Sequence, residues 1–322
     1  MGRDLYENSP AAAAFLDRVI EFDGMDHIRE LCFEGPAELL TRTDNVQPAI
    51  TAISLMVLEA IREATDITPI ACAGHSLGEY AAHAAAGSFS AEVAMNLVRW
   101  RGFWMNQASQ PPNPPGAMVA VMGLGAGALK GIVAEIGTDK LAVANINSPG
   151  QIIISGTKDA VEQVESTAKE AGAKRCVMLN VSGAWHSPLM VPAEAKMKGL
   201  LEEVITPEQT SISESVKVVA NATSDVVHDL DSLRHTLTRQ ITSPVRWDAC
   251  VKRLLGLAGY PDFPSQLSED IREELGNPPV FVEIGPGKVL KGLLRSNDRK
   301  LKAVNVEDVA GVKALKDMVE VN

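Results

Sequence analysis

The sequence is short of several features that would place it in a familiar class of protein. Aromatic residues make up only 4% of its 322 residues, so a folded core must be built mainly from aliphatic side chains. The longest apolar run, residues 49–58, falls well short of the roughly 20 residues that a membrane-spanning helix needs. Residues 1–6 lack the pattern of a signal peptide. We therefore expect a cytoplasmic protein without a membrane segment.

Basic residues and cysteines are scarce as well. The 30 Lys and Arg residues are outnumbered by 41 Asp and Glu residues, and the formal net charge of −11 argues against a nucleic-acid binder. Four cysteines lie in apolar runs without forming a Cys-x-x-Cys pair, and we expect them to be buried, reduced thiols: Cys32, Cys72, Cys176 and Cys250. The six histidines are scattered, so no metal site is expected.

What the chain does contain is an alternation of helical and strand patterns that is typical of an α/β fold. The proline-rich residues 110–116 interrupt this alternation and mark a boundary. The segment that follows has the order βαββαβ of a ferredoxin-like unit. We therefore predict a ferredoxin-like subdomain over residues 115–183, inserted into a discontinuous domain of residues 1–114 and 184–322 with a mostly parallel sheet.

Three local predictions concern single elements of this fold. A helix is predicted over residues 47–64, with Pro48 in its first turn, where proline is tolerated. Residues 68–73 are predicted to form a short apolar strand that runs into a glycine-flanked turn. Asn147-Ser148-Pro149-Gly150 is predicted to be a turn between two strands.

The sharpest chemical signal is Gly74-His75-Ser76-Leu77-Gly78, a G-x-S-x-G pattern between a strand and a helix. In that context the glycines allow a tight turn that raises the Ser76 hydroxyl above the sheet edge. The same turn points the Leu77 amide at the space that a tetrahedral oxyanion would occupy. A plain strand–helix turn is the alternative interpretation.

A serine hydroxyl needs a base to become a nucleophile, and two further residues are candidates for the site. His186 follows a strand and precedes a proline-marked helix start, which makes it a better base than His75 or His83. Arg101 lies in an apolar helix, where its guanidinium could hold a substrate carboxylate in a bidentate contact. The alternatives are a structural histidine and a surface arginine.

Taken together, the motifs resemble those of the malonyl-CoA:acyl carrier protein transacylase family over nearly the whole chain. The resemblance rests on separate stretches in the family's order, which are residues 45–49 (NVQPA), 74–80 (GHSLGEY), 101–102 (RG), 147–151 (NSPGQ), 183–187 (GAWHS), Gln240 with 243–247 (SPVRW), and 283–290 (EIGPGKVL).

The resemblance implies an α/β-hydrolase-like domain with a ferredoxin-like insert, and a ping-pong enzyme that needs no cofactor. Such an enzyme moves malonyl from malonyl-CoA to the phosphopantetheine thiol of acyl carrier protein, in fatty acid or polyketide synthesis. Carried over by motif, Ser76 is the nucleophile, His186 its base and Arg101 the carboxylate ligand. The backbone carbonyl of Gln240 orients the imidazole, and Leu77 supplies an oxyanion-hole amide.

The same resemblance makes Gln47, Asn145 and Asn147 candidate cleft-lining residues. In one respect the sequence departs from the family, whose members begin with a strand and an F-P-G-Q-G-S-Q loop that gives a second oxyanion amide. Without such a donor about 3 kcal/mol of transition-state stabilisation would be lost. We expect Met1 to be an internal methionine. A serine hydrolase or thioesterase, and an inactive remnant that only binds carrier protein, stay open as alternatives.

Acyl carrier proteins are acidic, so this acidic chain needs a local basic face to bind one. Lys288, Lys291 and Arg295 belong to a basic segment near the C-terminus and are candidates for that face. A solvated helix end is the alternative. We expect a monomer, and we have no role for the long polar stretch over residues 260–279.

Overall fold

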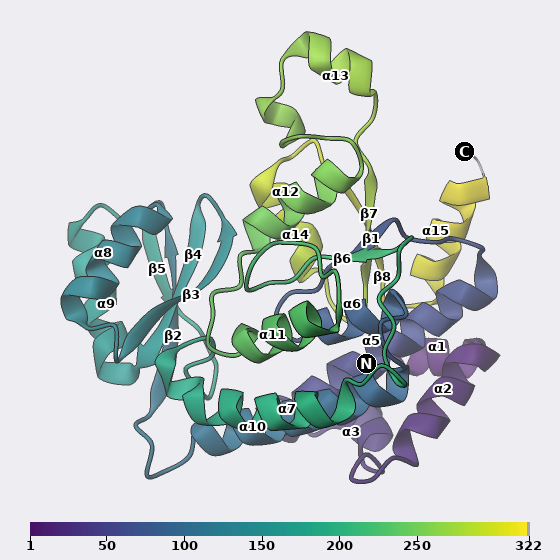
Figure 1. Ribbon diagram of the computed structural model, residues 1–322, viewed down its shortest axis with the longest axis horizontal. Helices are drawn as coiled ribbons and strands as arrows, with labels where there is room; N and C mark the ends of the chain where they lie inside the picture. Colours follow the sequence, from purple (N-terminus) through teal and green to yellow (C-terminus); the bar gives the residue numbers. More distant parts are fainter. Residues whose placement is uncertain (321–322) are drawn as a thin grey trace.

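The computed structural model describes residues 1–320, which fold into two structural parts that lie side by side (Figure 1). One part is a four-stranded antiparallel sheet with two helices, at the left of the figure. The other is a larger arrangement of helices around four short parallel strands. This mixed architecture confirms the predicted α/β fold class.

Long helices form the base of the larger part. Helix α5 (Thr43–Ala64) contacts both α2 (Pro10–Ile20) and α7 (Ala91–Ala108), and α7 also contacts α10 (Val191–Val204). Their shared core is mostly aliphatic, as the shortage of aromatics requires. Helix α7 begins after Ser90 because the serine side chain accepts a hydrogen bond from the backbone of Val93. None of the helices within residues 1–320 is both long and apolar enough to cross a membrane.

Shorter helices complete this part around the long ones. They are α1 (Arg3–Asn8), α3 (Ile28–Glu34), α4 (Ala37–Leu40), the single-turn helix η1 (Pro188–Met190), α11 (Leu230–Gln240) and α12 (Trp247–Leu257).

The strands of the larger part form two short sheets. β1 (Ala71–Cys72) pairs in parallel with β6 (Lys217–Val218), and β7 (Val280–Ile284) pairs in parallel with β8 (Lys302–Val306). The pairing is parallel as predicted, but within residues 1–320 it does not join the four strands into one sheet. The strand predicted over residues 68–73 shrinks to two residues, because only Ala71 and Cys72 have strand partners.

Each strand of these sheets except β6 is followed along the chain by a helix that packs nearby. α6 (Gly78–Ala85) follows β1, α14 (Val289–Asn297) follows β7, and α15 (Val309–Glu320) follows β8. The β1–α6 connection is the segment that carries the G-x-S-x-G pattern.

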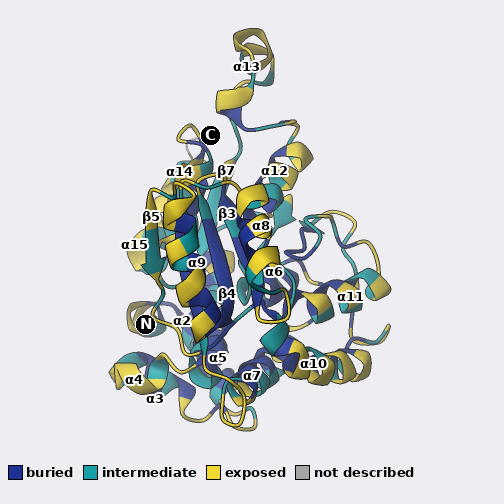
Figure 2. Cartoon of the chain, turned by 90° about the vertical axis from the view of Figure 1, so that its left-hand side faces the viewer, coloured by how far each residue is buried: buried dark blue, intermediate teal, exposed yellow. Residues whose placement is uncertain are grey.

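The four-stranded sheet has the order β3-β4-β2-β5, which is the ferredoxin-like order. Its strands are β2 (Gly116–Met122), β3 (Leu141–Ser148), β4 (Gln151–Thr157) and β5 (Arg175–Met178), and its helices are α8 (Ala126–Ile136) and α9 (Lys158–Glu170). Alternate residues of β2 face opposite sides: Val119 and Val121 join the core with the helices, whereas Met118 and Ala120 pack with Trp185 on the other face. Figure 2 shows the buried strands behind the exposed outer surfaces of α8 and α9.

A polar arm projects from the rest of the molecule at the top of Figures 1 and 2. It contains η2 (Pro264–Gln266) and the exposed helix α13 (Glu269–Leu275). Tyr260 closes its base by donating a hydrogen bond from its hydroxyl to the carbonyl of Gly276, at 2.5 Å. The buried carboxylate of Asp298 accepts a hydrogen bond from the backbone of Ser265, at 2.6 Å. These anchors account for the stretch over residues 260–279 as a tethered surface feature.

Besides the shortened strand, three other predictions were wrong in detail. Helix α5 begins at Thr43, so Pro48 lies in its second turn; Asp44 in the first turn favours the early start, and proline removes only one helical hydrogen bond. Asn147 and Ser148 belong to strand β3, which stays paired through an irregular register until Pro149 and Gly150 make the turn. Of the four free cysteines, Cys32 and Cys250 are buried, but the thiols in β1 and β5 are only half-buried.

Candidate active site

The turn between β1 and α6 holds Ser76 in a conformation that few serines adopt. Its φ of 50° lies in the left-handed region, which strains a residue with a side chain. Gly74 makes the tight turn possible, since a Cβ there would lie 1.9 Å from the backbone carbon of Gly78. The Leu77 amide at the start of α6 has no hydrogen-bond acceptor among the described residues. A plain strand–helix turn would not need this strain.

His186 approaches Ser76 from a segment 110 residues further along the chain. Its Nε2 lies 2.7 Å from the Ser76 Oγ, and its Nδ1 lies 2.8 Å from the backbone oxygen of Gln240. A carbonyl oxygen only accepts, so Nδ1 carries the proton and Nε2 presents its lone pair to the serine hydroxyl. His186 also has a positive φ, of 57°. These contacts are the arrangement that an activated serine nucleophile requires.

The electrostatics of the site favour an uncharged His186. Burial, followed by the nearby positive charge of Arg101, lowers the pKa of His186 to about 3. At neutral pH the imidazole is therefore free to accept the serine proton. His75 takes no part in this contact: its Nε2 lies 2.8 Å from the Asn147 Oδ1, and burial lowers its pKa as well.

Arg101 is the largest fully buried side chain of the described residues, with 1% of its surface exposed. No carboxylate of residues 1–320 forms a salt bridge with it. Its guanidinium instead donates to neutral oxygens: Nη1 to Gln47 Oε1 at 2.6 Å, and Nη2 to Ser76 Oγ at 2.9 Å and Gln240 Oε1 at 3.1 Å. A surface arginine is therefore the wrong interpretation. A buried cation without a counter-ion can bind an anionic group beside the nucleophile.

A cavity of about 270 Å³ opens onto these groups. Its wall is formed by helices α5 and α7, the turn that carries Ser76, the ferredoxin-like sheet and the segment before η1. The residues that line it are Thr43, Val46, Gln47, His75, Ser76, Leu77, Arg101, Met105, Met118, Asn145, Trp185 and His186. Of the three predicted cleft residues, Gln47 and Asn145 thus line the cavity, and Asn147 instead supports His75 from behind.

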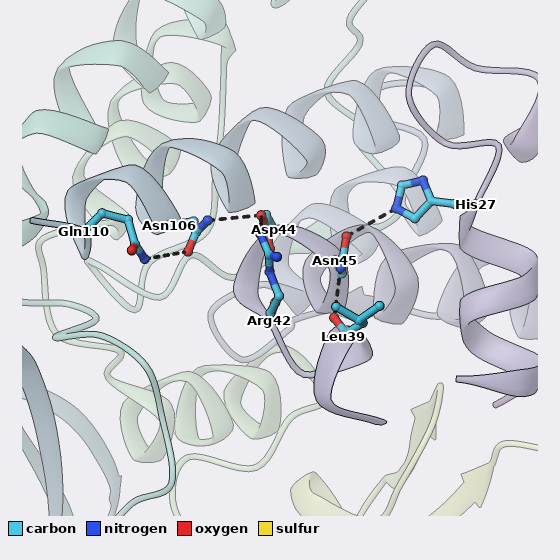
Figure 3. A network of polar contacts seen from close by, with 7 residues as sticks. All are labelled: His27, Leu39, Arg42, Asp44, Asn45, Asn106 and Gln110. Carbon is cyan, nitrogen blue, oxygen red and sulfur yellow. Dashed lines mark hydrogen bonds and ion pairs between the residues drawn. The ribbon is translucent and has the colours of Figure 1, made fainter. Parts of the chain in front are cut away.

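A polar network fixes the start of α5, which carries Gln47 into this cavity (Figure 3). Asp44 accepts a hydrogen bond from the Asn106 side chain of α7 at 3.0 Å, and Asn106 accepts one from Gln110 at 3.3 Å. On the other side, Asn45 contacts the His27 ring at 3.2 Å. The start of α5 and the end of α7 meet in this network. The two sides of the cavity wall that these helices form are therefore held together.

Comparison with known proteins now decides the family. A family model described as an acyl transferase domain matches residues 1–261. A malonyl CoA-acyl carrier protein transacylase from Bacillus subtilis is 40% identical over 96% of this chain and 89% of its own length. The chain belongs to the malonyl-CoA:acyl carrier protein transacylase family. The resemblance predicted from the motifs is thereby confirmed.

Solved structures of related malonyltransferases align with almost the whole of this family member. An acyl-carrier-protein S-malonyltransferase from Bartonella henselae matches with a TM-score of 0.83 and 32% identity, over 99% of this chain and 95% of the other. A malonyl-transacylase in complex with its type II PKS acyl-carrier protein matches with a TM-score of 0.81 and 32% identity, over 98% and 94%. The agreement extends to the fold as a whole.

Two residues of this family member support the site without having been singled out as candidates. Asn221 accepts a hydrogen bond from the Ser76 amide at 2.6 Å and donates one to the Gly74 carbonyl at 2.7 Å, so it holds both ends of the strained turn. Glu79 is fully buried beneath that turn, and burial raises its pKa to about 7, against hydrogen bonds from Gln240 and Asn221. Their signals in the sequence were weak, because Asn221 only follows a short strand and Glu79 only follows the serine motif.

A larger hollow of about 420 Å³ lies elsewhere, between residues 87–90 and 207–211. It contains neither Ser76 nor His186, and it is wide open to solvent. Its size therefore does not make it a better candidate for this chemistry than the smaller cavity.

Proposed function

We propose that this chain transfers a malonyl group from malonyl-CoA to the phosphopantetheine thiol of an acyl carrier protein. The observation that carries this proposal is the buried guanidinium of Arg101, which lies 2.9 Å from the Ser76 Oγ and has no carboxylate partner within residues 1–320. Malonyl differs from most acyl groups by its free carboxylate, and this is the group that such a guanidinium binds. The names of the related proteins support the same substrate.

The proposed reaction has two half-reactions on Ser76. In the first, Oγ attacks the thioester carbonyl while His186 Nε2 takes its proton, and the Leu77 amide stabilises the oxyanion. The tetrahedral intermediate breaks its carbon–sulfur bond, and His186 returns the proton to the departing CoA thiol. In the second, the carrier's thiol gives its proton to His186 and attacks the malonyl ester, and the serine oxygen recovers that proton. A thioester is already activated, so the chemistry uses no cofactor.

Two other functions compete with this proposal. A hydrolase would release the acyl group to water, and an inactive carrier-binding module would never form the acyl-serine. The pairing of Ser76, His186 and Gln240 supports formation of the intermediate. Arg101 supports selection of a carboxylated acyl group rather than a plain lipid ester.

The test is the intact mass of the purified 322-residue chain after brief mixing with malonyl-CoA. We expect a malonyl adduct that is absent in a Ser76→Ala variant. Adding phosphopantetheinylated acyl carrier protein should then move the adduct to the carrier. Release of free malonate instead would indicate a hydrolase, and no adduct at all would contradict the proposal, with carrier binding alone indicating an inactive module.

We further propose that the carrier protein binds beside helix α14. Lys288, Lys291 and Arg295 lie on or next to this helix; Lys288 is paired with Glu307 at 3.2 Å, whereas no salt bridge within residues 1–320 engages the other two. The last residue of α14, Asn297, donates a hydrogen bond to the Asn147 carbonyl at 2.9 Å. Asn147 contacts His75 in the cavity wall, so the helix is tied to the site.

This docking proposal predicts a separation of the two half-reactions. Charge reversal at Lys291 and Arg295 should raise the KM for carrier protein at least several-fold, because an acidic partner would meet like charge. Loading of Ser76 from malonyl-CoA should not change. Charge reversal at Lys313 and Lys316 of α15 provides a control of equal charge. An unchanged KM for the carrier in the α14 variant would contradict the docking site.

A further inference from the structure

A buried carboxylate lies directly behind the cavity and takes no part in the reaction described above. Glu79, in the first turn of α6, has no exposed surface. Its Oε2 accepts hydrogen bonds from Gln240 Nε2 at 2.6 Å and from the backbone of Asn221 at 3.1 Å. Its Oε1 has no hydrogen-bond partner in the described residues. Burying a carboxyl group with one oxygen unpartnered costs free energy of folding. We therefore looked for a role of its contacts in the active site.

The side chain of Gln240 connects Glu79 to Arg101. The Gln240 amide donates from Nε2 to Glu79 and to the Ser76 carbonyl, at 2.6 and 2.9 Å, and accepts at Oε1 from Arg101, at 3.1 Å. Glu79 Oε2 and the Ser76 carbonyl both accept from this NH₂, so together they keep it turned toward themselves. The amide oxygen consequently faces the guanidinium, where the opposite orientation would place donor against donor.

The charge of Glu79 also acts on Arg101 through space. Burial lowers the pKa of Arg101, and interactions with Tyr80 and then with Glu79 oppose that effect. In its ionised form Glu79 is thus a negative charge placed one side chain behind the guanidinium. It favours the charged form of Arg101 without occupying the face that is turned to Ser76.

We propose that Glu79 is a positioning residue for acyl selection, which orients the Gln240 amide so that Arg101 meets the free carboxylate of the acyl group. The inference rests on the proposed malonyl transfer. It adds that selection between carboxylated and uncharged acyl groups depends on a residue that touches neither the substrate nor the nucleophile's side chain.

A merely structural role for Glu79 makes a different prediction. If the carboxylate only stabilises the fold, its loss would slow acylation of Ser76 equally for every acyl-CoA. If it acts through Arg101, its loss would slow malonyl loading and leave acetyl loading nearly unchanged, since acetyl has no carboxylate to bind. The ratio of the two rates therefore separates the roles.

The experiment compares kcat/KM for acylation of Ser76 by malonyl-CoA and by acetyl-CoA, followed by intact mass. In Glu79→Gln we expect the malonyl-to-acetyl ratio to fall about tenfold, a change in discrimination of about 1.4 kcal/mol. In an Arg101→Ala background the same substitution should leave the ratio unchanged, because the two residues act in series. Asp298→Asn, which neutralises a buried carboxylate at the base of the polar arm, should leave the ratio at the wild-type value.

The outcomes distinguish a failure of the proposed function from a failure of the role of Glu79. Wild-type protein that malonyl-CoA fails to load would overturn the proposed function itself. Wild-type protein that loads, with equal losses for both acyl groups in Glu79→Gln, would overturn only the role of Glu79. If Glu79→Gln does not fold, Gln240→Met removes the same relay but keeps the backbone carbonyl that holds His186. That variant should show the same fall in the ratio, and an unchanged ratio would overturn the inference.

Discussion

At the scale of single residues, the site depends on backbone conformations that side chains normally avoid. Ser76 and His186 both have positive φ values, of 50° and 57°. Each such residue costs on the order of 1–3 kcal/mol and persists only where its surroundings impose it. Asn221, which bonds to both ends of the serine turn, is one such constraint.

Replacing Asn221 with alanine is therefore expected to act on both stability and activity. The Ser76 amide and the Gly74 carbonyl would lose their partner, and each buried unsatisfied group costs about 1–3 kcal/mol. We expect a lower denaturation midpoint and a slower malonyl loading rate, measured by urea unfolding and intact mass. Loss of stability with an unchanged loading rate would show that the turn keeps its shape without Asn221.

A second residue-scale prediction concerns the partner of Arg101 on helix α5. Gln47 offers a neutral oxygen to the guanidinium at 2.6 Å. Gln47→Glu would place a carboxylate there, neutralise Arg101 and compete with the acyl carboxylate. Hydrogen bonds to charged groups are worth about 1.5–3 kcal/mol, so kcat/KM for malonyl-CoA should fall roughly 10- to 100-fold.

The control for this variant is Gln47→Met, which removes the contact but adds no charge. It should impair malonyl loading less than the glutamate does. Equal losses in the two variants would contradict the electrostatic explanation.

The sequence predicted the individual residues better than the contacts between them. The serine turn could be predicted because the G-x-S-x-G spacing is local and its first glycine, Gly74, has a steric reason. The burial of Arg101 could not, since its helix is apolar on several sides and the partners Gln47 and Gln240 lie far away in sequence. Glu79 and Asn221 were missed for the same reason: their function arises from bonds that span more than 140 residues.

At the scale of elements, the cavity depends on how closely α5 and α7 approach each other. Gly102 lies next to Arg101 on α7, at the point where α7 crosses the start of α5. A Cβ at this position would lie 2.8 Å from the Thr43 carbonyl oxygen and 3.2 Å from the Asp44 Cα. Because these are backbone atoms, the helices would have to move apart.

Gly102→Ala should therefore lower the free energy of unfolding by about 1–3 kcal/mol and shift Gln47 away from Arg101. Gly199→Ala is the matched control, since it also lies within a helix but, among residues 1–320, no atom beyond its chain neighbours and the adjacent backbone of its own helix lies within 4 Å of the added carbon. There the better helix propensity of alanine should stabilise the protein by about 0.5–1 kcal/mol. Thermal unfolding and malonyl loading measure both effects, and similar stability changes in the two variants would refute the close-approach argument.

The elements themselves were predictable in kind and order but not at their ends. Sequence patterns identified the long helix α5 and the βαββαβ order of the ferredoxin-like unit, because these signals lie within the segments. The ends depend on partners elsewhere: Ser148 stays in β3 because it faces Gln151 of β4, and the strand before the serine motif is short because only two of its residues are paired.

At the scale of the whole molecule, the site exists only where separate parts meet. The helical base contributes Arg101 and Gln47, the short parallel strands present Ser76, and the ferredoxin-like sheet adds Met118 and Asn145. The site therefore shares the stability of the complete fold, and its buried charges should appear in the pH dependence of unfolding.

Glu79 and the buried histidines affect that pH dependence with opposite signs. Burial lowers the pKa of His83 and of His186 to about 3, so their contribution to stability is present above pH 6.5 and is lost as the pH falls. Burial raises the pKa of Glu79 from 4.5 to about 7, so its contribution is fully present below pH 4.5 and is lost as the pH rises through 7.

Comparing wild type with Glu79→Gln isolates the carboxyl, because both proteins contain the histidines. The free energy of unfolding of wild type minus that of the variant should fall by about 3 kcal/mol between pH 4.5 and pH 7, at 1.36 kcal/mol per pKa unit. Above pH 7 the difference should stay level. Urea unfolding at half-unit pH steps measures it, and a difference that is constant from pH 4.5 to pH 8 would show that Glu79 titrates as an ordinary carboxyl.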